Sequence, residues 1–300
     1  MRYSELIENA KEARRRGDFR GAIQYYREAF SKKIIVKDLV DFGLVHLDNN
    51  QPMQAIEIFS EITEAYPEIP EIHYYLGLAH EIIGKKDEAI KNYLDAVKHD
   101  PYFSDAYFSL ALLADESGDE SLAVEYYKKT LLYNPNHYWA NLNLGSFYEK
   151  NNRLELALAH TRKAHIIDPG EKMAAYNLGV IYGKMKQYEE AEKYYLEEIN
   201  KGGYILAYLN LALICKDVHR DYDRARYYYL EGISKDKDNP TLWYNLACVY
   251  ALTEDYENTY SCLLYACIRD PKLKEFMLKD AELADFIESH HYEKLSKELG

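Results

Sequence analysis

The chain has 300 residues, of which 48% are hydrophobic and 29% are charged, a composition typical of an ordered, mostly helical protein. Its 37 basic and 50 acidic residues give a net charge of −13, which disfavours generic binding to nucleic acid or anionic membranes, because both select basic surfaces. No apolar run is long enough to cross a bilayer, and residues 1–19 lack the apolar core of a secretion signal. We therefore expect a cytoplasmic protein that neither binds nucleic acid nor inserts into a membrane.

A repeat of about 34 residues runs along the chain. Its markers are Asp-Pro or Asn-Pro pairs, each preceded at intervals of about twelve residues by two small residues such as Ala157 and Gly145 before Pro169. A fixed period in this range predicts stacked two-helix units rather than a globular enzyme domain. Alignment on the small residues gives eight repeats within an array over residues 1–273: 3–36, 36–69, 70–103, 104–137, 138–171, 172–204, 205–239 and 240–273.

Several repeats depart from the pattern. The first has neither the leucine-glycine pair nor the closing proline, and the sixth ends in Gly202-Gly203. The seventh carries one extra residue, which we place in its turn, between Val218 and Asp223. Residues 274–300 leave the repeat altogether, and we expect one or two helices that cap the open end of the array. A docking helix for a partner is the alternative for this segment.

The residues that recur in each repeat resemble the tetratricopeptide repeat family. In the third repeat the matching residues are Leu76-Gly77, His80, Ala89, Tyr93, Ala96 and Pro101. In the fifth they are Leu144-Gly145, Tyr148, Ala157, Ala164 and Pro169. The resemblance implies an all-α solenoid, a right-handed superhelix whose first helices line a concave groove where ligands bind.

One polar residue recurs at the sixth position of the repeats, counted from the first residue of each. The last four repeats carry Asn143, Asn177, Asn210 and Asn245 there. Asparagine is a poor helix former, but its amide can pair with both the C=O and the N–H of a peptide backbone. The row resembles the asparagine ladder of peptide-binding family members. The competing interpretation is that Asn-Leu-Gly occurs commonly in this family, with or without a bound peptide.

Apolar and charged residues flank the asparagines on the same predicted helix faces. The apolar ones are Trp139, Leu142, Tyr176, Leu209 and Tyr244. They suit ligand side chains, although burial between adjacent first helices would account for some of them. Glu149 and Lys184 stand at the twelfth and thirteenth positions, in a groove whose middle we expect to be acidic. The predicted partner is a protein or peptide with apolar and some basic residues.

Signatures of catalysis are absent from the sequence. It has no phosphate-binding glycine loop and no nucleophile elbow, so we expect no enzyme activity. The four cysteines include no CxxC pair, and we expect neither a metal nor a cofactor. Three functions remain open: a scaffold or adaptor that binds an extended peptide, a structural subunit that assembles through its ends or convex face, and a regulatory module acting in trans on an enzyme or transcription complex. The oligomeric state is also open.

Overall fold

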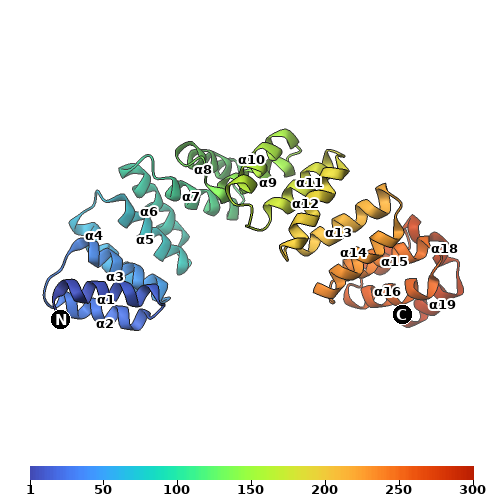
Figure 1. Ribbon diagram of the computed structural model, residues 1–300, viewed down its shortest axis with the longest axis horizontal. Coiled ribbons are helices and arrows are strands. Elements are labelled where there is room, and N and C mark those ends of the chain that lie inside the picture. Colours follow the sequence, from blue (N-terminus) through green and yellow to red (C-terminus); the bar gives the residue numbers. More distant parts are fainter. The chain divides into compact units, whose positions relative to one another are not determined.

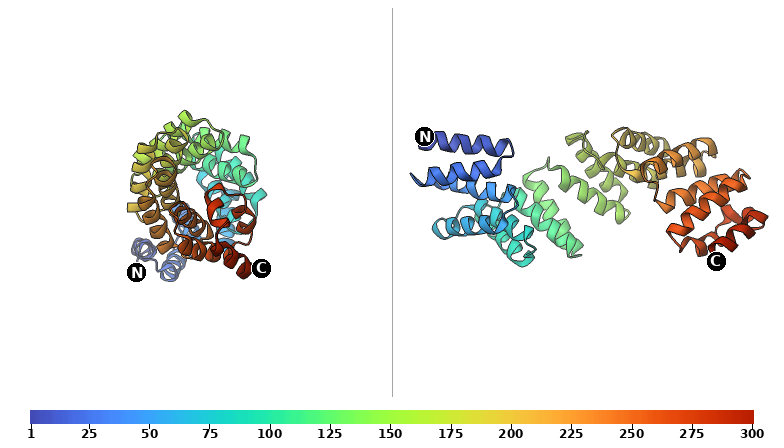
Figure 2. Two further views of the ribbon diagram at one scale, coloured as in Figure 1. Left: turned by 90° about the vertical axis from the view of Figure 1, so that its right-hand side faces the viewer. Right: turned by 90° about the horizontal axis from the view of Figure 1, so that it is seen from below.

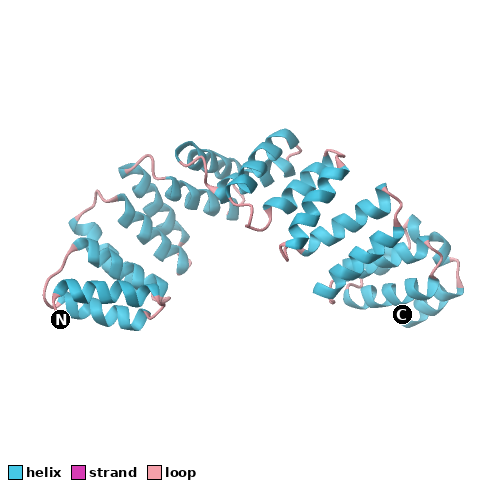
Figure 3. Cartoon of the chain, viewed as in Figure 1, coloured by secondary structure: helices cyan, strands magenta, loops and turns pink.

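The computed structural model describes all 300 residues, Met1–Gly300, and consists of helices joined by short loops, without strands (Figure 3). The chain divides into two compact parts, which we call the N-terminal body (residues 1–143) and the C-terminal body (residues 144–300). The division lies inside helix α9 (Tyr138–Lys150). The fold is all-α, and within each body consecutive helix pairs stack as in a solenoid.

The N-terminal body contains four complete helix pairs. In each pair the two helices pack on each other, and the second helices of the first three pairs also pack on the first helix of the next pair (Figure 1). Figure 2 shows α1 beside α2 from two other directions. The helices are α1 (Tyr3–Arg15), α2 (Phe19–Phe30), α3 (Val36–Asp48), α4 (Pro52–Ala65), α5 (Pro70–Ile82), α6 (Lys86–His99), α7 (Ser104–Glu116) and α8 (Glu120–Tyr133).

The C-terminal body continues the same pattern. Its pairs again pack internally and on their successors, α10 on α11, α12 on α13 and α14 on α15. None of its helices, nor any in the N-terminal body, is both long and apolar enough to span a bilayer. The helices are α10 (Leu154–Ile167), α11 (Ala174–Lys184), α12 (Tyr188–Asn200), α13 (Ile205–Leu213), α14 (Tyr222–Lys235), α15 (Pro240–Leu252), α16 (Tyr256–Arg269), α17 (Leu273–Met277), α18 (Ala284–Ile287) and α19 (His290–Leu299).

The turn inside each helix pair requires one residue with a left-handed backbone. Glycine fills this position in the first, third and fourth pairs, and asparagine in the second and fifth. The remaining three turns hold bulkier residues, for which this conformation costs about 1–2 kcal/mol. The eight residues are Gly17, Asn50, Gly84, Gly118, Asn152, Lys186, Arg220 and Glu254.

Gly84→Ala tests this backbone requirement. A methyl group at Gly84 would meet no atom within 4 Å, so the change adds backbone strain without a clash. We expect the free energy of unfolding to fall by about 1–2 kcal/mol in urea denaturation. Gly84→Asn should lose less, because asparagine tolerates this conformation better than alanine does. Equal losses in the two variants would show that the strain is not the cause.

The small residue at the eighth position of the repeats makes room for an aromatic ring. A Cβ added to Gly77 would stand 2.5 Å from the ring of Tyr93, and one added to Gly179 would stand 2.5 Å from the ring of Tyr195. Both tyrosines are buried, and each lies on the second helix of the same pair. Glycine therefore leaves room for these two tyrosine rings, which lie against the backbone of the first helix.

The extra residue of the seventh repeat lies in a helix and not in the turn, which corrects the prediction that placed it between Val218 and Asp223. Helix α13 continues into a π-helical turn, η1 (Ile214–Val218), and the left-handed residue Arg220 follows it as in the other turns. A π-turn accommodates one inserted residue without ending the helix. The insertion buries the side chain of Lys216, which is 3% exposed.

Residues 273–299 form three short helices and the 3-10 turn η2 (Ala281–Leu283), more pieces than the one or two helices predicted. Helix α19 packs on α16, and η2 packs on α15. Leu283, Phe286 and Leu295 are fully buried. The segment therefore covers part of the last helix pair, and a cap remains our interpretation of it.

Candidate peptide-binding surface

The four asparagines of the predicted ladder lie on four first helices. Asn143 lies on α9 in the N-terminal body. Asn177, Asn210 and Asn245 lie on α11, α13 and α15 in the C-terminal body. All four side chains are partly exposed. Their shared position in the repeat thus places all four at the surface of a first helix.

Two of the asparagines hold the hydroxyl of a buried tyrosine. Asn143 donates from Nδ2 to the Tyr127 hydroxyl at 3.0 Å, and Asn210 donates to the Tyr195 hydroxyl at 3.2 Å. Asn210 also lies 3.5 Å from the hydroxyl of Tyr176. A buried tyrosine hydroxyl needs a partner, so these two amides have a structural role that the sequence analysis missed. A tyrosine followed by asparagine 15 or 16 residues later is the signal that could have revealed it.

The other two asparagines have different partners. Asn177 donates to the Ser146 hydroxyl at 3.0 Å, and Asn245 donates to the backbone carbonyl of Thr241 at 2.8 Å. The buried groups in the corresponding places are the hydroxyls of Thr161 and Tyr229, and neither has a hydrogen-bond partner. Asn177 and Asn245 therefore stabilise no core hydroxyl.

The side-chain oxygens of the asparagines remain available. Each of the hydrogen bonds described above uses Nδ2 as the donor, and none uses Oδ1 as an acceptor. The internal bond fixes the orientation of the amide, and the oxygen is left to accept from another group. Within the C-terminal body, α11, α13 and α15 can therefore offer a row of oriented acceptors.

The predicted apolar flank is only partly present. Trp139 is 43% exposed, and Tyr176 and Leu209 are partly exposed. Leu142 and Tyr244 are 3% and 4% exposed, so the prediction that they contact a ligand is wrong. Both side chains are buried by packing within the protein.

Tyr244 is covered by the C-terminal segment. Its hydroxyl donates to Asp280 Oδ2 at 2.8 Å, and its ring lies 5.6 Å from that of Phe276.

Tyr176 packs edge-on against Tyr204 at 5.0 Å, and burial raises the pKa of its hydroxyl, which therefore stays protonated.

The two predicted charged residues neutralise each other. Lys184 Nζ lies 2.5 Å from Glu149 Oε1, which joins α11 to the part of α9 in the C-terminal body. A pair of this kind adds little net charge to the surface. The acidic character expected here is accordingly weaker than the sequence suggests.

Comparison with protein families identifies the repeat. The profile of the tetratricopeptide repeat matches residues 40–107, 83–131 and 108–172, and a second tetratricopeptide repeat profile matches residues 174–197. The matches together cover more than half of the chain. The chain belongs to the tetratricopeptide repeat family. Such repeats generally mediate protein–protein interactions and are generally not catalytic.

Solved tetratricopeptide repeat structures share the fold. The pilF protein of Pseudomonas aeruginosa is 23% identical, with a TM-score of 0.60 over 71% of this chain and 99% of that chain. Part of a repeat protein from Cytophaga hutchinsonii is 18% identical, with a TM-score of 0.61 over 83% of this chain and 99% of that chain. These identities show the fold alone. No curated protein matches this chain in a sequence comparison.

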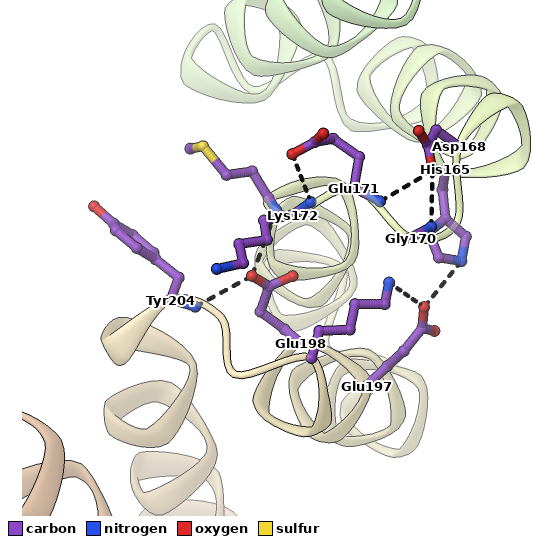
Figure 4. A network of polar contacts seen from close by, with 10 residues as sticks. His165, Asp168, Gly170, Glu171, Lys172, Glu197, Glu198 and Tyr204 are labelled. Carbon is purple, nitrogen blue, oxygen red and sulfur yellow. Dashed lines mark hydrogen bonds and ion pairs between the residues drawn. The ribbon is translucent and has the colours of Figure 1, made fainter. Parts of the chain in front are cut away.

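A buried glutamate in the sixth tetratricopeptide repeat binds the backbone just before two first helices. Glu198 stands where other repeats carry an alanine, such as Ala96 or Ala164, and it is fully buried. Its Oε1 accepts from the backbone N–H groups of Tyr204 at 3.1 Å and Met173 at 3.4 Å (Figure 4). These residues precede α13 and α11, the helices that carry Asn210 and Asn177.

The same carboxylate explains why the sixth repeat has Gly203 where other repeats have a proline. A Cβ added to Gly203 would stand 2.1 Å from Glu198 Oε1, so only glycine fits beside it. Figure 4 shows the neighbouring Glu197 turned away toward His165, which it contacts at 3.3 Å.

Proposed function

We propose that this protein is a non-catalytic scaffold that binds an extended segment of a partner protein along the inner surface of its first helices. The observation that carries the proposal is the row of partly exposed amides at one position of α11, α13 and α15. Each amide is held by an internal hydrogen bond and keeps its oxygen free to accept.

The amide oxygens would accept from backbone N–H groups of the bound segment. Packed helices stand about 10 Å apart, and an extended chain advances about 3.3 Å per residue. One asparagine would therefore meet about every third residue of the ligand. Tyr176 and Leu209, beside the amides of the C-terminal body, would contact its side chains.

The partner segment would combine apolar residues with some lysine or arginine. Apolar side chains suit the exposed aromatic and aliphatic flank. The preference for basic residues rests on the net charge of −13, because the Glu149–Lys184 pair supplies no excess of negative charge.

The test uses the two asparagines that stabilise no core hydroxyl. Asn177→Ala combined with Asn245→Ala should leave folding unchanged and weaken partner binding by about five-fold or more, since each lost hydrogen bond contributes about 0.5–1.5 kcal/mol. Partners captured from a native lysate are identified by mass spectrometry, and their affinity is then measured with purified proteins. Asn151→Ala combined with Asn200→Ala, both exposed, is the matched control.

Loss of a partner from the ladder variant alone would support the proposal. Capture of the same partners with the same affinity by both variants would rule out the amide row as the site. Assembly through the ends or the convex face would then become the better account.

A further inference from the structure

Three side chains with metal-binding atoms meet where the C-terminal segment packs on α15, all within the C-terminal body. They are Cys248 of α15 and Asp280 and Glu282 at the start of η2, and their ligand atoms lie within 4.8 Å of one another. Cys248 Sγ stands 3.8 Å from Asp280 Oδ2. The thiol is buried, and the two carboxylates are half-buried.

This cluster carries more negative than positive charge. Lys216, buried by the π-turn, contacts Glu282 and also lies 2.9 Å from Asp217. Asp280 has no cation beside it and accepts only from neutral donors, which include the Tyr244 hydroxyl and the backbone N–H of Glu282. Two carboxylates this close repel each other, and one lysine compensates for only one of them. The arrangement therefore favours an additional cation.

A buried hydroxyl beside the cluster has no partner. Tyr229 is fully buried, and its hydroxyl makes no hydrogen bond. Burial raises the pKa of this hydroxyl, and the charges of Asp217 and Cys248 raise it further. Unsatisfied buried hydroxyls are rare, and each one indicates a missing partner such as a bound water or ion.

We propose that Cys248, Asp280 and Glu282 bind a divalent metal ion of the zinc class. A sulfur ligand selects zinc and similar ions over magnesium and calcium. A tetrahedral zinc ion with one sulfur and two oxygen ligands needs S···O separations of about 3.5 Å, close to the observed 3.8 Å. The fourth ligand is a water molecule, which the Tyr229 hydroxyl can hydrogen-bond.

Metal binding reduces the excess of negative charge. Cys248 loses its thiol proton to solvent as the sulfur–metal bond forms, and no oxidant or reductant is required. The ion and Lys216 then carry three positive charges against the three anionic ligands and Asp217. Lys216 keeps its contact with the Glu282 carboxylate, and Tyr244 keeps its hydrogen bond to Asp280. Both contacts orient the carboxylates, as hydrogen-bond partners of metal ligands commonly do.

The metal would join the C-terminal segment to the last helix pair. Cys248 belongs to α15, whereas Asp280 and Glu282 belong to the segment. Metal binding therefore stabilises the attachment of residues 273–299, a property separate from peptide binding by the amide row.

The experiment titrates the full-length, chelator-treated protein with cobalt(II) and then with zinc. We expect one ion per chain, a sulfur-to-cobalt charge-transfer absorption band, and a melting temperature that rises with zinc concentration. Cys248→Ser should remove the charge-transfer band, and Asp280→Asn should weaken binding at least ten-fold. Cys262→Ser changes a buried cysteine outside the cluster and should behave like the wild type.

Absence of the charge-transfer band in the wild type, or its persistence in Cys248→Ser, would overturn the proposal. Circular dichroism establishes that each variant is folded. If Cys248→Ser does not fold, the proposal is tested with Asp280→Asn and Glu282→Gln instead. Zinc affinity equal to that of the wild type in both variants would also overturn the proposal. The Asn177 and Asn245 variant should bind metal normally, so this test is independent of the proposed scaffold function.

Discussion

Asn210→Ala is expected to lower the free energy of unfolding by about 1–3 kcal/mol, the cost of leaving a buried polar group without its partner. The buried group is the Tyr195 hydroxyl, which accepts from Asn210 at 3.2 Å. Urea denaturation followed by circular dichroism measures the change. Because the amide also faces the proposed ligand, a binding defect in this variant alone would not separate recognition from stability.

A double-mutant cycle isolates the internal bond. Tyr195→Phe removes the hydroxyl, so Asn210→Ala made in that background should cost much less than in the wild type. Asn245→Ala is the matched control and should stay within about 0.5 kcal/mol of the wild type, because Asn245 donates only to the backbone of its own helix. Equal destabilisation by Asn210→Ala and Asn245→Ala would contradict the structural role of Asn210.

Gly179→Ala is expected to destabilise the protein by about 1–3 kcal/mol through overpacking. The added Cβ would stand 2.5 Å from Tyr195 Cε1 and 2.6 Å from Cδ1. Tyr195 is buried and its hydroxyl is held by Asn210, so the ring cannot move away cheaply. The loss is large for a single methyl group because the two helices meet at this glycine.

Gly183→Ala provides a control on the same helix. Its Cβ would meet only the Tyr195 hydroxyl, at 3.9 Å, an ordinary contact. Alanine is the better helix former, so this variant should gain about 0.5–1 kcal/mol or remain neutral. A similar loss at both positions in thermal or urea unfolding would show that helix α11 tolerates no substitution and that overpacking is not the reason.

The two groups of asparagines require different experiments. Asn143 and Asn210 combine a core hydrogen bond with an exposed oxygen, whereas Asn177 and Asn245 offer the oxygen without the core bond. Mutating the whole row at once would mix a folding defect with a binding defect. Only the second pair reports on recognition directly.

The sequence by itself determined the repeat, the helix pairs and the positions that must stay small. These follow from local spacing, since a period near 34 residues with glycine or alanine at fixed intervals has few structural solutions. It also determined that the four asparagines share a helix face, because the helical period fixes which residues point the same way.

Only the tertiary structure decided which contacts those faces make. Tyr244 is buried because the C-terminal segment folds over it, and Asn210 is partly structural because a tyrosine of the preceding second helix lies beneath it. The cluster of Cys248 with Asp280 escaped detection since the two residues are 32 positions apart in sequence and meet only through packing. A repeat period fixes the orientation of a side chain on its own helix, but the neighbouring helices decide whether that side chain meets solvent, a hydroxyl or a carboxylate.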